Sequence, residues 1–196
     1  MIKQYNGFKA EKSIEGGLPV EAYICRIVGA AVRKSANTGS EYLAVAFDIS
    51  EGAYAGYFSN LYANRTSEDA KYKGILNVMI PVEGTQWFES QKKQFNNLIY
   101  AVEESNKGFH FDWDESKLKN QFIGILFRNE EWEWEGKTGW NVKPFKALSV
   151  DDVKTGNYKI PKDKTLKKPE TNTAPAPAYT NASFNPAELS DDDIPF

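Results

Sequence analysis

Residues 42–50 alternate between large apolar side chains and small or polar ones, a two-residue period that fits a β-strand and not a helix. One predicted face carries Leu43, Val45, Phe47 and Ile49. A turn-forming stretch at residues 35–40 precedes this segment, and a β-branched stretch over residues 20–34 precedes the turn. Together they predict a β-hairpin, with Gly29 at a bend or bulge in its long first strand.

The rest of the folded part predicts three more strands and one helix. An aromatic-rich stretch predicts a third strand over residues 54–65, and apolar residues at helical spacing predict a helix from Thr85 to about Ser105. Residues 122–134 and 140–148 flank a glycine-containing turn and predict the last two strands. Three strands, a helix and two strands resemble the order of an OB-fold. We therefore expect an all-β domain with one helix, a five-stranded Greek-key barrel.

Two stretches are not explained by this order. Residues 1–17 match none of its elements, and residues 66–84 are interpreted as an insertion with a strand of its own over residues 75–82. In the helix, the aromatic rings of Trp87, Phe88 and Phe95 are expected to face the core and to cover one end of the barrel.

The composition changes near residue 160 and divides the chain into three parts. Residues 1–159 are expected to form the OB-fold domain. Residues 160–187, rich in Lys, Pro, Ala and Thr without apolar periodicity, predict a disordered linker. Residues 188–196 form an acidic tip that has too little apolar surface to fold alone.

The net charge is −3, with 24 basic and 27 acidic residues. Four of the acids lie in the last sixteen residues, so the remaining chain has 24 basic and 23 acidic residues, a net of +1. A near-neutral domain can carry a basic groove, and the excess negative charge is confined to the tail.

Catalysis and metal binding have little support in the sequence. The chain has one cysteine, Cys25, and one histidine, His110, which exclude an internal disulfide and the usual zinc ligand sets. A triad through His110 and a metal site at the acidic residues 112–115 remain alternatives without further support. We therefore expect a protein that is not an enzyme, with no catalytic residue, metal or cofactor.

The sequence has no apolar run long enough to span a membrane, and its first residues are not a signal peptide. With a single cysteine, this predicts a protein of a reducing compartment, the cytoplasm of a bacterial host, with no membrane partner.

Binding of single-stranded DNA needs aromatic rings that stack on bases beside Lys or Arg that follow phosphates. In an OB-fold, these residues lie on the second and third strands and in the loops that join strands one to two and four to five. The candidate DNA-binding residues are Arg33, Lys34, Tyr42, Tyr62, Arg65, Arg128, Trp132, Trp134, Lys137, Trp140 and Lys143. Lys71 and Lys73 around Tyr72 form another small basic and aromatic cluster.

The last predicted hairpin is the clearest of these candidates. Arg128, Trp132 and Trp134 share one parity and should project from one face, while the glutamates between and after the tryptophans take the other. Trp140 is expected roughly opposite Trp134. The alternative is that the tryptophans cover one end of the barrel or pair across strands for stability.

The final residues are an acidic run followed by an apolar, aromatic end. They are Asp191, Asp192, Asp193, Ile194, Pro195 and Phe196. This end resembles the C-terminal tip of bacterial single-stranded DNA-binding proteins, which docks replication, recombination and repair enzymes. The resemblance implies that the three aspartates meet a basic rim on the partner and that the last three residues fill its apolar pocket. The alternative is an acidic tail that only aids solubility.

The domain resembles the phage-encoded single-stranded DNA-binding proteins of the OB-fold type. The resemblance rests on residues 33–42 (RKSANTGSEY) and 140–145 (WNVKPF). The N-terminal motifs of the bacterial housekeeping protein are missing, so its homotetramer is not carried over and the oligomeric state stays open.

Two functions follow from these observations. The first is coating of single-stranded DNA, without sequence specificity, during replication, recombination or repair, with recruitment of processing enzymes. The alternative is an interaction module that does not bind DNA and whose tail mimics the bacterial tip to divert host replication enzymes. A tryptophan-rich small barrel would suit protein or sugar ligands as well.

Overall fold

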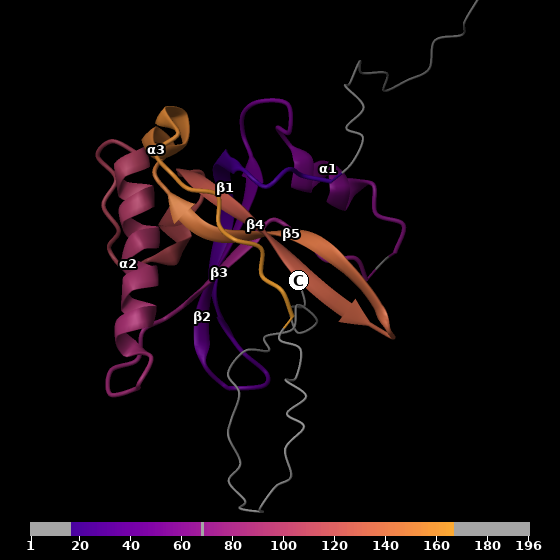
Figure 1. Cartoon of the computed structure of the whole chain (residues 1–196). Coiled ribbons are helices and arrows are strands. Elements are labelled where there is room, and N and C mark those ends of the chain that lie inside the picture. The colour runs from indigo at the N-terminus through magenta and orange to yellow at the C-terminus, as the bar shows by residue number, and fades with distance from the viewer. Residues whose placement is uncertain (1–16, 68, 167–196) are drawn as a thin grey trace, which may run out of the picture.

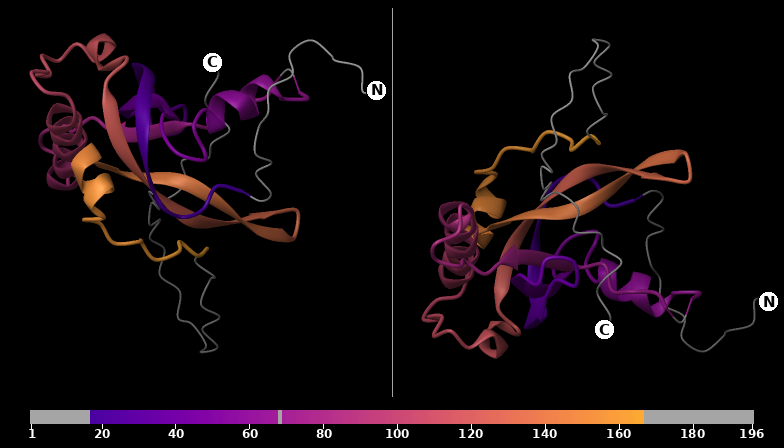
Figure 2. Two further views of the ribbon diagram at one scale, coloured as in Figure 1. Left: turned by 90° about the horizontal axis from the view of Figure 1, so that it is seen from above. Right: turned by 90° about the horizontal axis from the view of Figure 1, so that it is seen from below.

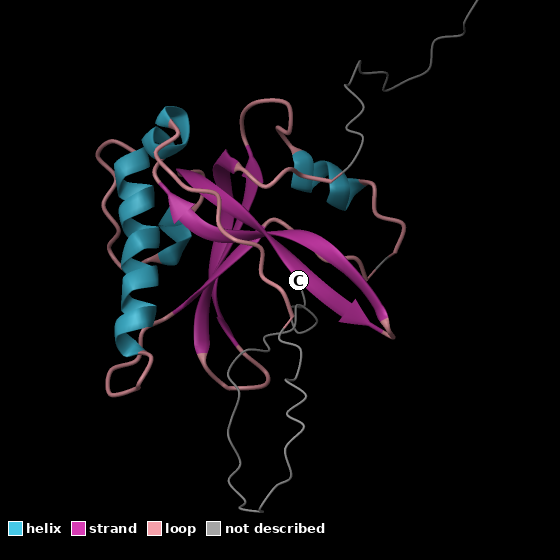
Figure 3. Ribbon diagram, in the orientation of Figure 1, coloured by secondary structure: helices cyan, strands magenta, loops and turns pink. Residues whose placement is uncertain are grey.

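A computed structural model describes residues 17–67 and 69–166. The chain forms a five-stranded antiparallel sheet with the strand order β3-β2-β1-β4-β5, flanked by three α-helices (Figures 1 and 3). The elements, in chain order, are β1 (Ala22–Lys34), β2 (Glu41–Ile49), α1 (Tyr57–Ala63), β3 (Ile75–Met79), α2 (Phe88–Ser105), the 3₁₀ helix η1 (Glu115–Leu118), β4 (Phe122–Trp134), β5 (Lys137–Leu148) and α3 (Val150–Thr155). The acidic tip and residues 1–16 lie outside the described residues.

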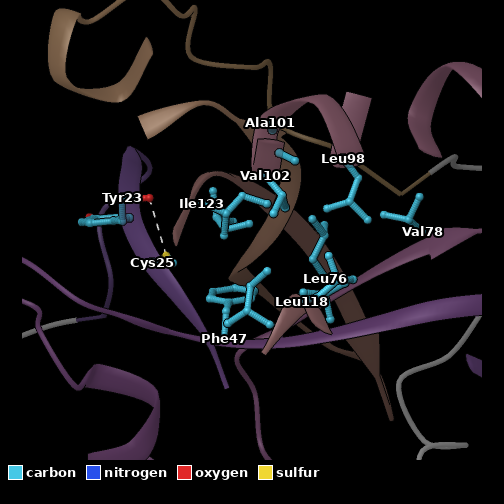
Figure 4. Packing of buried hydrophobic residues seen from close by; sticks show 14 of the residues in the cluster. Tyr23, Cys25, Phe47, Leu76, Val78, Leu98, Ala101, Val102, Leu118 and Ile123 are labelled. Carbon is cyan, nitrogen blue, oxygen red and sulfur yellow. Dashed lines mark hydrogen bonds between the residues drawn. The ribbon is translucent and has the colours of Figure 1, made fainter. Parts of the chain in front are cut away.

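The predicted first hairpin is confirmed. β1 and β2 pair along their length, and the register shifts between Ile27 and Gly29, where a bend was expected. The alternating face of β2 is buried as predicted, because it packs into the main core. That core packs the β1–β2 hairpin against α2 and η1. Figure 4 shows Phe47 from β2 among Leu118, Leu76 and Ile123.

The third strand predicted over residues 54–65 is wrong, because most of this stretch is the helix α1. The carboxylate of Asp48, on β2, accepts hydrogen bonds from the backbone N–H groups of Phe58 at 3.0 Å and Ser59 at 3.1 Å. These bonds satisfy donors at the start of the helix that a strand would direct elsewhere. The Phe58 ring is buried and stacks on Phe127. A tertiary contact thus overrides the local preference of aromatic residues for strands.

The third strand lies instead in the stretch read as an insertion. β3 pairs with β2 from Ile75↔Ala46 to Met79↔Tyr42 and forms one edge of the sheet. β5 forms the other edge, and Cα atoms of β3 and β5 approach within 8 Å of each other.

Helix α2 packs against β3, β4 and β5. It begins at Phe88 rather than at Thr85, with no side-chain cap at Trp87, and it ends at Ser105 as predicted. Its buried residues are Phe95, Leu98, Ala101 and Val102. The expectation of three core rings holds for Phe95, but Trp87 is exposed and Phe88 is only partly buried, because both lie at the free first turn. The expectation of a single helix is also wrong, since α1 and α3 are helical.

Strands β4 and β5 form a long hairpin that extends beyond the rest of the sheet on the side of α1 (Figure 2). β4 has the predicted bounds, and β5 begins at Lys137 rather than at Trp140, because the turn is confined to Glu135 and Gly136. Beyond its pairing with β1, the outer edge of β4 is met by the chain that follows α3.

This following segment, residues 163–166, is here called the strap. The backbone N–H of Lys164 donates a hydrogen bond to the carbonyl oxygen of Asn129 at 2.9 Å. The backbone N–H of Glu131 donates to the carbonyl oxygen of Lys164, also at 2.9 Å. The N–H of Leu166 donates to the Glu131 carboxylate at 3.0 Å. The stretch predicted as an unstructured linker therefore starts with residues that pair with the domain. None of the described helices has the length and apolar character needed to cross a bilayer.

Candidate nucleic-acid interface

A groove of about 540 Å³ lies between α1, the segment that leads into β3, and β5. It is here called the seam groove, since it follows the two edge strands of the sheet. The described residues that line it are Gly17, Leu18, Tyr57, Phe58, Leu61, Lys71, Tyr72, Lys73, Ile75, Leu76, Asn77, Trp140, Asn141, Val142, Lys143, Pro144 and Phe145.

The charge of the seam groove has one sign. Lys71, Lys73 and Lys143 line it, and none of its described lining residues is Asp or Glu. Lys71 and Lys143 also interact with other parts of the protein, whereas Lys73 lies exposed. Three cations with no acid among the lining residues give a positive local potential inside a domain that is almost neutral.

Aromatic rings alternate with these lysines. The Tyr72 hydroxyl donates to the carbonyl oxygen of Phe47 at 2.9 Å, which fixes the ring between Lys71 and Lys73. Burial raises the pKa of the Tyr72 phenol to about 12. The phenol is neutral at physiological pH with or without this shift. On the β5 side, the Trp140 ring is 49% exposed. The groove therefore offers a fixed ring on one wall and an accessible indole on the other.

The register of the β4–β5 hairpin separates the tryptophans. Trp140 pairs with Glu131, whereas Trp134 pairs with Lys137 and Trp132 with Gly139. Residues that pair directly project from the same face, so Trp140 lies on the opposite face from Trp132 and Trp134. The expectation that Trp140 lies opposite Trp134 is therefore wrong, because the tight turn brings Lys137 into that position.

The outer face of the hairpin carries the other predicted residues. The ladder is regular from Arg128 to Trp134, so Arg128, Trp132 and Trp134 share one face as predicted. Lys143 pairs with Arg128, and Lys137 lies beside the exposed Trp134. The Trp132 indole covers Gly139, where an added Cβ would lie 2.6 Å from its ring.

Arg128 is committed to contacts within the protein. Its guanidinium lies 4.2 Å from the centre of the Phe145 ring and forms a 2.5 Å ion pair with Glu130. Glu130 also lies 3.6 Å from the Nζ of Lys164 in the strap. The charge of Arg128 is thus balanced, which makes it a weaker phosphate ligand than the sequence implies.

The β1–β2 hairpin contributes none of the lining residues of the seam groove. Arg33 and Lys34 end β1, and Lys34 is exposed. Tyr42 is only 7% exposed, between Arg33 on β1 and Met79 on β3. Its predicted role in base stacking does not fit this burial, because little of the side chain is left accessible to a base.

Tyr62 and Arg65 lie beside the groove, although on α1 and just after it rather than on a strand. The Tyr62 ring meets the Tyr72 ring edge to face, with centroids 5.9 Å apart. Reading the helix as a strand hid Tyr57 and Leu61 as lining residues. The contact from Asp48 that favours the helix joins residues ten positions apart, so the pattern of residues 54–65 does not reveal it.

No group of three or more His, Cys, Asp or Glu side chains that could hold a metal ion exists within the described ranges. In the acidic stretch 112–115, Asp112 pairs with Lys117, whose hydrogen bond lowers the pKa of Asp112. Asp114 accepts from the N–H of Ser116 and caps η1. His110 projects into solvent near Glu103. No family model matches the chain, and no curated protein matches it either.

Proposed function

We propose that this protein binds single-stranded DNA without sequence specificity, and that the seam groove is its binding site. The observation that carries this proposal is the composition of the groove, in which Lys71 and Lys73 flank the fixed Tyr72 ring, the exposed Trp140 lies on the β5 wall and none of the described lining residues is an acid. Every base has a π-face, so stacking tolerates any sequence and contributes about 1–3 kcal/mol per base. Lysines in the same groove neutralise phosphates and release counterions.

We further propose that the sheet is an OB-fold of the phage single-stranded DNA-binding type. Support comes from the strand order, in which β1 joins a β1–β2–β3 meander to the β4–β5 hairpin. The approach of β3 to β5 would close such a barrel, with α2 between the third and fourth strands. The position of the groove next to the β4–β5 hairpin fits the surface that OB-folds use for oligonucleotides.

The acidic tip, in this proposal, recruits replication, recombination or repair proteins through Phe196 and the residues before it. Three carboxylates beside an aromatic ring and a terminal carboxylate suit an apolar pocket with a basic rim. The place of action would be the cytoplasm of a bacterial host.

The direct test is titration of oligo-dT into the full chain at several salt concentrations, followed by tryptophan fluorescence. We expect binding that weakens steeply with salt and quenches fluorescence. Trp140→Leu should remove most of the quenching and weaken binding about 5- to 150-fold, as expected for about 1–3 kcal/mol of stacking. The matched control is Trp113→Phe, since Trp113 is 80% exposed and does not line the groove.

No binding of oligo-dT by the folded protein, even at low salt, would contradict the proposal and favour the interaction module. Equal effects of the two tryptophan variants would place the DNA elsewhere on the protein.

A further inference from the structure

A short run of groups in contact continues from one wall of the seam groove to the end of α1. Tyr72 lines the groove, and the edge of the neighbouring Tyr62 ring contacts it, at 5.9 Å between centroids and 74° between planes. The guanidinium of Arg65 then lies 4.1 Å from the centre of the Tyr62 ring. Neither Tyr62 nor Arg65 lines the groove, so this run extends beyond it.

The two outer members of the run are accessible to a ligand. Tyr62 is 37% exposed, and Arg65 lies exposed in the turn after α1. The Nη1 of Arg65 donates to the carbonyl oxygen of Tyr62 at 3.0 Å, which holds the guanidinium over the ring. A guanidinium held in this way presents its remaining donors and its outer face in a fixed orientation, at low entropic cost.

We propose that Tyr62 and Arg65 form a second subsite for single-stranded nucleic acid, adjoining the seam groove past Tyr72. The Arg65 guanidinium would contact one phosphate and offer its plane to a base, as Arg does in single-strand recognition. The inference rests on the proposed function and adds a direction to it: the strand leaves the groove over Tyr72 toward the C-terminal end of α1.

A purely structural role for Arg65 is the competing explanation. Its hydrogen bond to Tyr62 satisfies a carbonyl in the last turn of α1, where a cation also interacts well with the helix dipole. This role predicts a change in stability and no dependence on the length of the DNA.

Oligonucleotide length separates the two explanations. An oligo-dT of about four nucleotides should fill only the groove, while one of about sixteen should reach the second subsite as well, within the range of site sizes of single OB-folds. In the full chain, Arg65→Gln should weaken binding of the longer oligonucleotide about fivefold and lower its salt slope by about 0.7, the value for one phosphate contact on a single strand. Binding of the shorter one should not change.

Arg26→Gln is the matched control, because the Arg26 guanidinium also lies over a ring, that of Phe122 at 5.9 Å, on β1 and away from the groove. It should leave both affinities unchanged. Arg65→Lys keeps the charge and loses the planar fork, so it should restore the salt slope and only part of the affinity.

Equal weakening of both lengths by Arg65→Gln, or no change in either, would overturn the second subsite while leaving the groove proposal intact. If the unmodified protein binds neither length, the proposed function fails first. Melting temperatures of each variant show whether a loss of affinity reflects a loss of folding.

Discussion

The carboxylate of Asp48 on β2 accepts the backbone N–H of Phe58 at the start of α1, at 3.0 Å, across ten residues of sequence. This bond ties the helix that forms one wall of the seam groove to the central hairpin of the sheet. Phe58 in turn stacks on Phe127 in the core. The Asp48 carboxylate and the packing of Phe58 therefore both hold the groove wall in position.

Replacement of Asp48 by Ala should lower the free energy of unfolding by about 1–2 kcal/mol, the usual cost of losing a helix cap. It should also weaken oligo-dT binding, because Tyr57 and Leu61 line the groove from α1. Chemical denaturation and the oligo-dT titration measure the two effects. Ser149→Ala is the matched control, since Ser149 caps α3, away from the groove; it should affect stability alone. Equal loss of binding in both variants would disprove the link between cap and groove.

Gly74→Ala should destabilise the protein strongly, by about 2 kcal/mol or more, because this position has no space for a methyl group. A Cβ there would lie 2.8 Å from Cγ of the Phe58 ring and would also collide with the backbone of Phe47. Thermal unfolding gives the measurement. At Gly29 a Cβ would have no neighbour within 4 Å, so Gly29→Ala provides the comparison and should cost much less. A mild effect at Gly74 would mean that the chain before β3 can move away.

The contribution of Tyr72 to stability should depend on pH. Its pKa is raised from 10.0 to about 12 on folding, chiefly by burial. A raised pKa means that the folded state holds the proton more tightly, so this stabilisation is complete below pH 10 and is lost as the pH rises toward 12. Tyr72→Phe should cost about 1 kcal/mol at neutral pH, through loss of the hydrogen bond to Phe47.

Denaturation of Tyr72→Phe and the unmodified protein at several pH values tests this dependence. The advantage of the unmodified protein over Tyr72→Phe should shrink above pH 10 and then reverse as the pH approaches 12, because about two pKa units correspond to more free energy than the lost hydrogen bond. Other tyrosines titrate in both proteins and cancel in the difference. A constant difference across this range would show that the hydroxyl is not buried in solution.

Lys164→Pro should detach the strap from β4, because it removes the N–H that donates to Asn129. Hydrogen–deuterium exchange of the Glu131 amide, which donates to Lys164, should become faster. Unfolding free energy should change little, since the strap residues are exposed. Lys164→Gln keeps the N–H and loses only the 3.6 Å ion pair with Glu130, so it should leave the exchange rate nearly unchanged. Faster exchange of the Glu131 amide in Lys164→Gln than in Lys164→Pro would show that charge, not backbone pairing, holds the strap.

Deletion of Phe196 should abolish recruitment of DNA-processing proteins and leave DNA affinity unchanged or raised, since an acidic tail can compete with DNA for a basic groove. Pull-down of host replication and repair enzymes by the intact and truncated chains is the measurement. Phe184→Ala removes an aromatic residue of the same tail outside the tip and should recruit normally. Equal recruitment after deletion of Phe196 would contradict docking through the tip.

The periodic parts of the sequence predicted the sheet well. Alternation predicted β2, because a two-residue period with one buried face allows only one register. The turn residues between residues 134 and 140 predicted the β4–β5 hairpin, but not its register at Trp140. The same reasoning failed over residues 54–65, where the apolar pattern fits neither a strand nor a helix clearly. The Asp48 carboxylate on β2 stabilises the helix there by accepting the N–H of Phe58. The third strand was consequently assigned to the wrong stretch.

The candidate site was predictable only in part. The basic and aromatic composition pointed to the β4–β5 hairpin, whose strand β5 lines the seam groove, and parity placed Trp132 and Trp134 on one face. The position of Trp140 depends on a turn that is shorter than expected, which moves it to the other face. The burial of Tyr42 depends on its strand neighbours, and sequence alone cannot supply such tertiary facts.

The strap also sets where the C-terminal tail begins. Leu166 is held beside Glu131 near the β4–β5 hairpin, and thirty residues, 167–196, follow it. A chain of that length spans at most about 100 Å, at about 3.5 Å per residue. These residues therefore start from a fixed origin, and their length limits their reach. If the tip docks a processing enzyme as proposed, its docking pocket must lie within about 100 Å of Leu166.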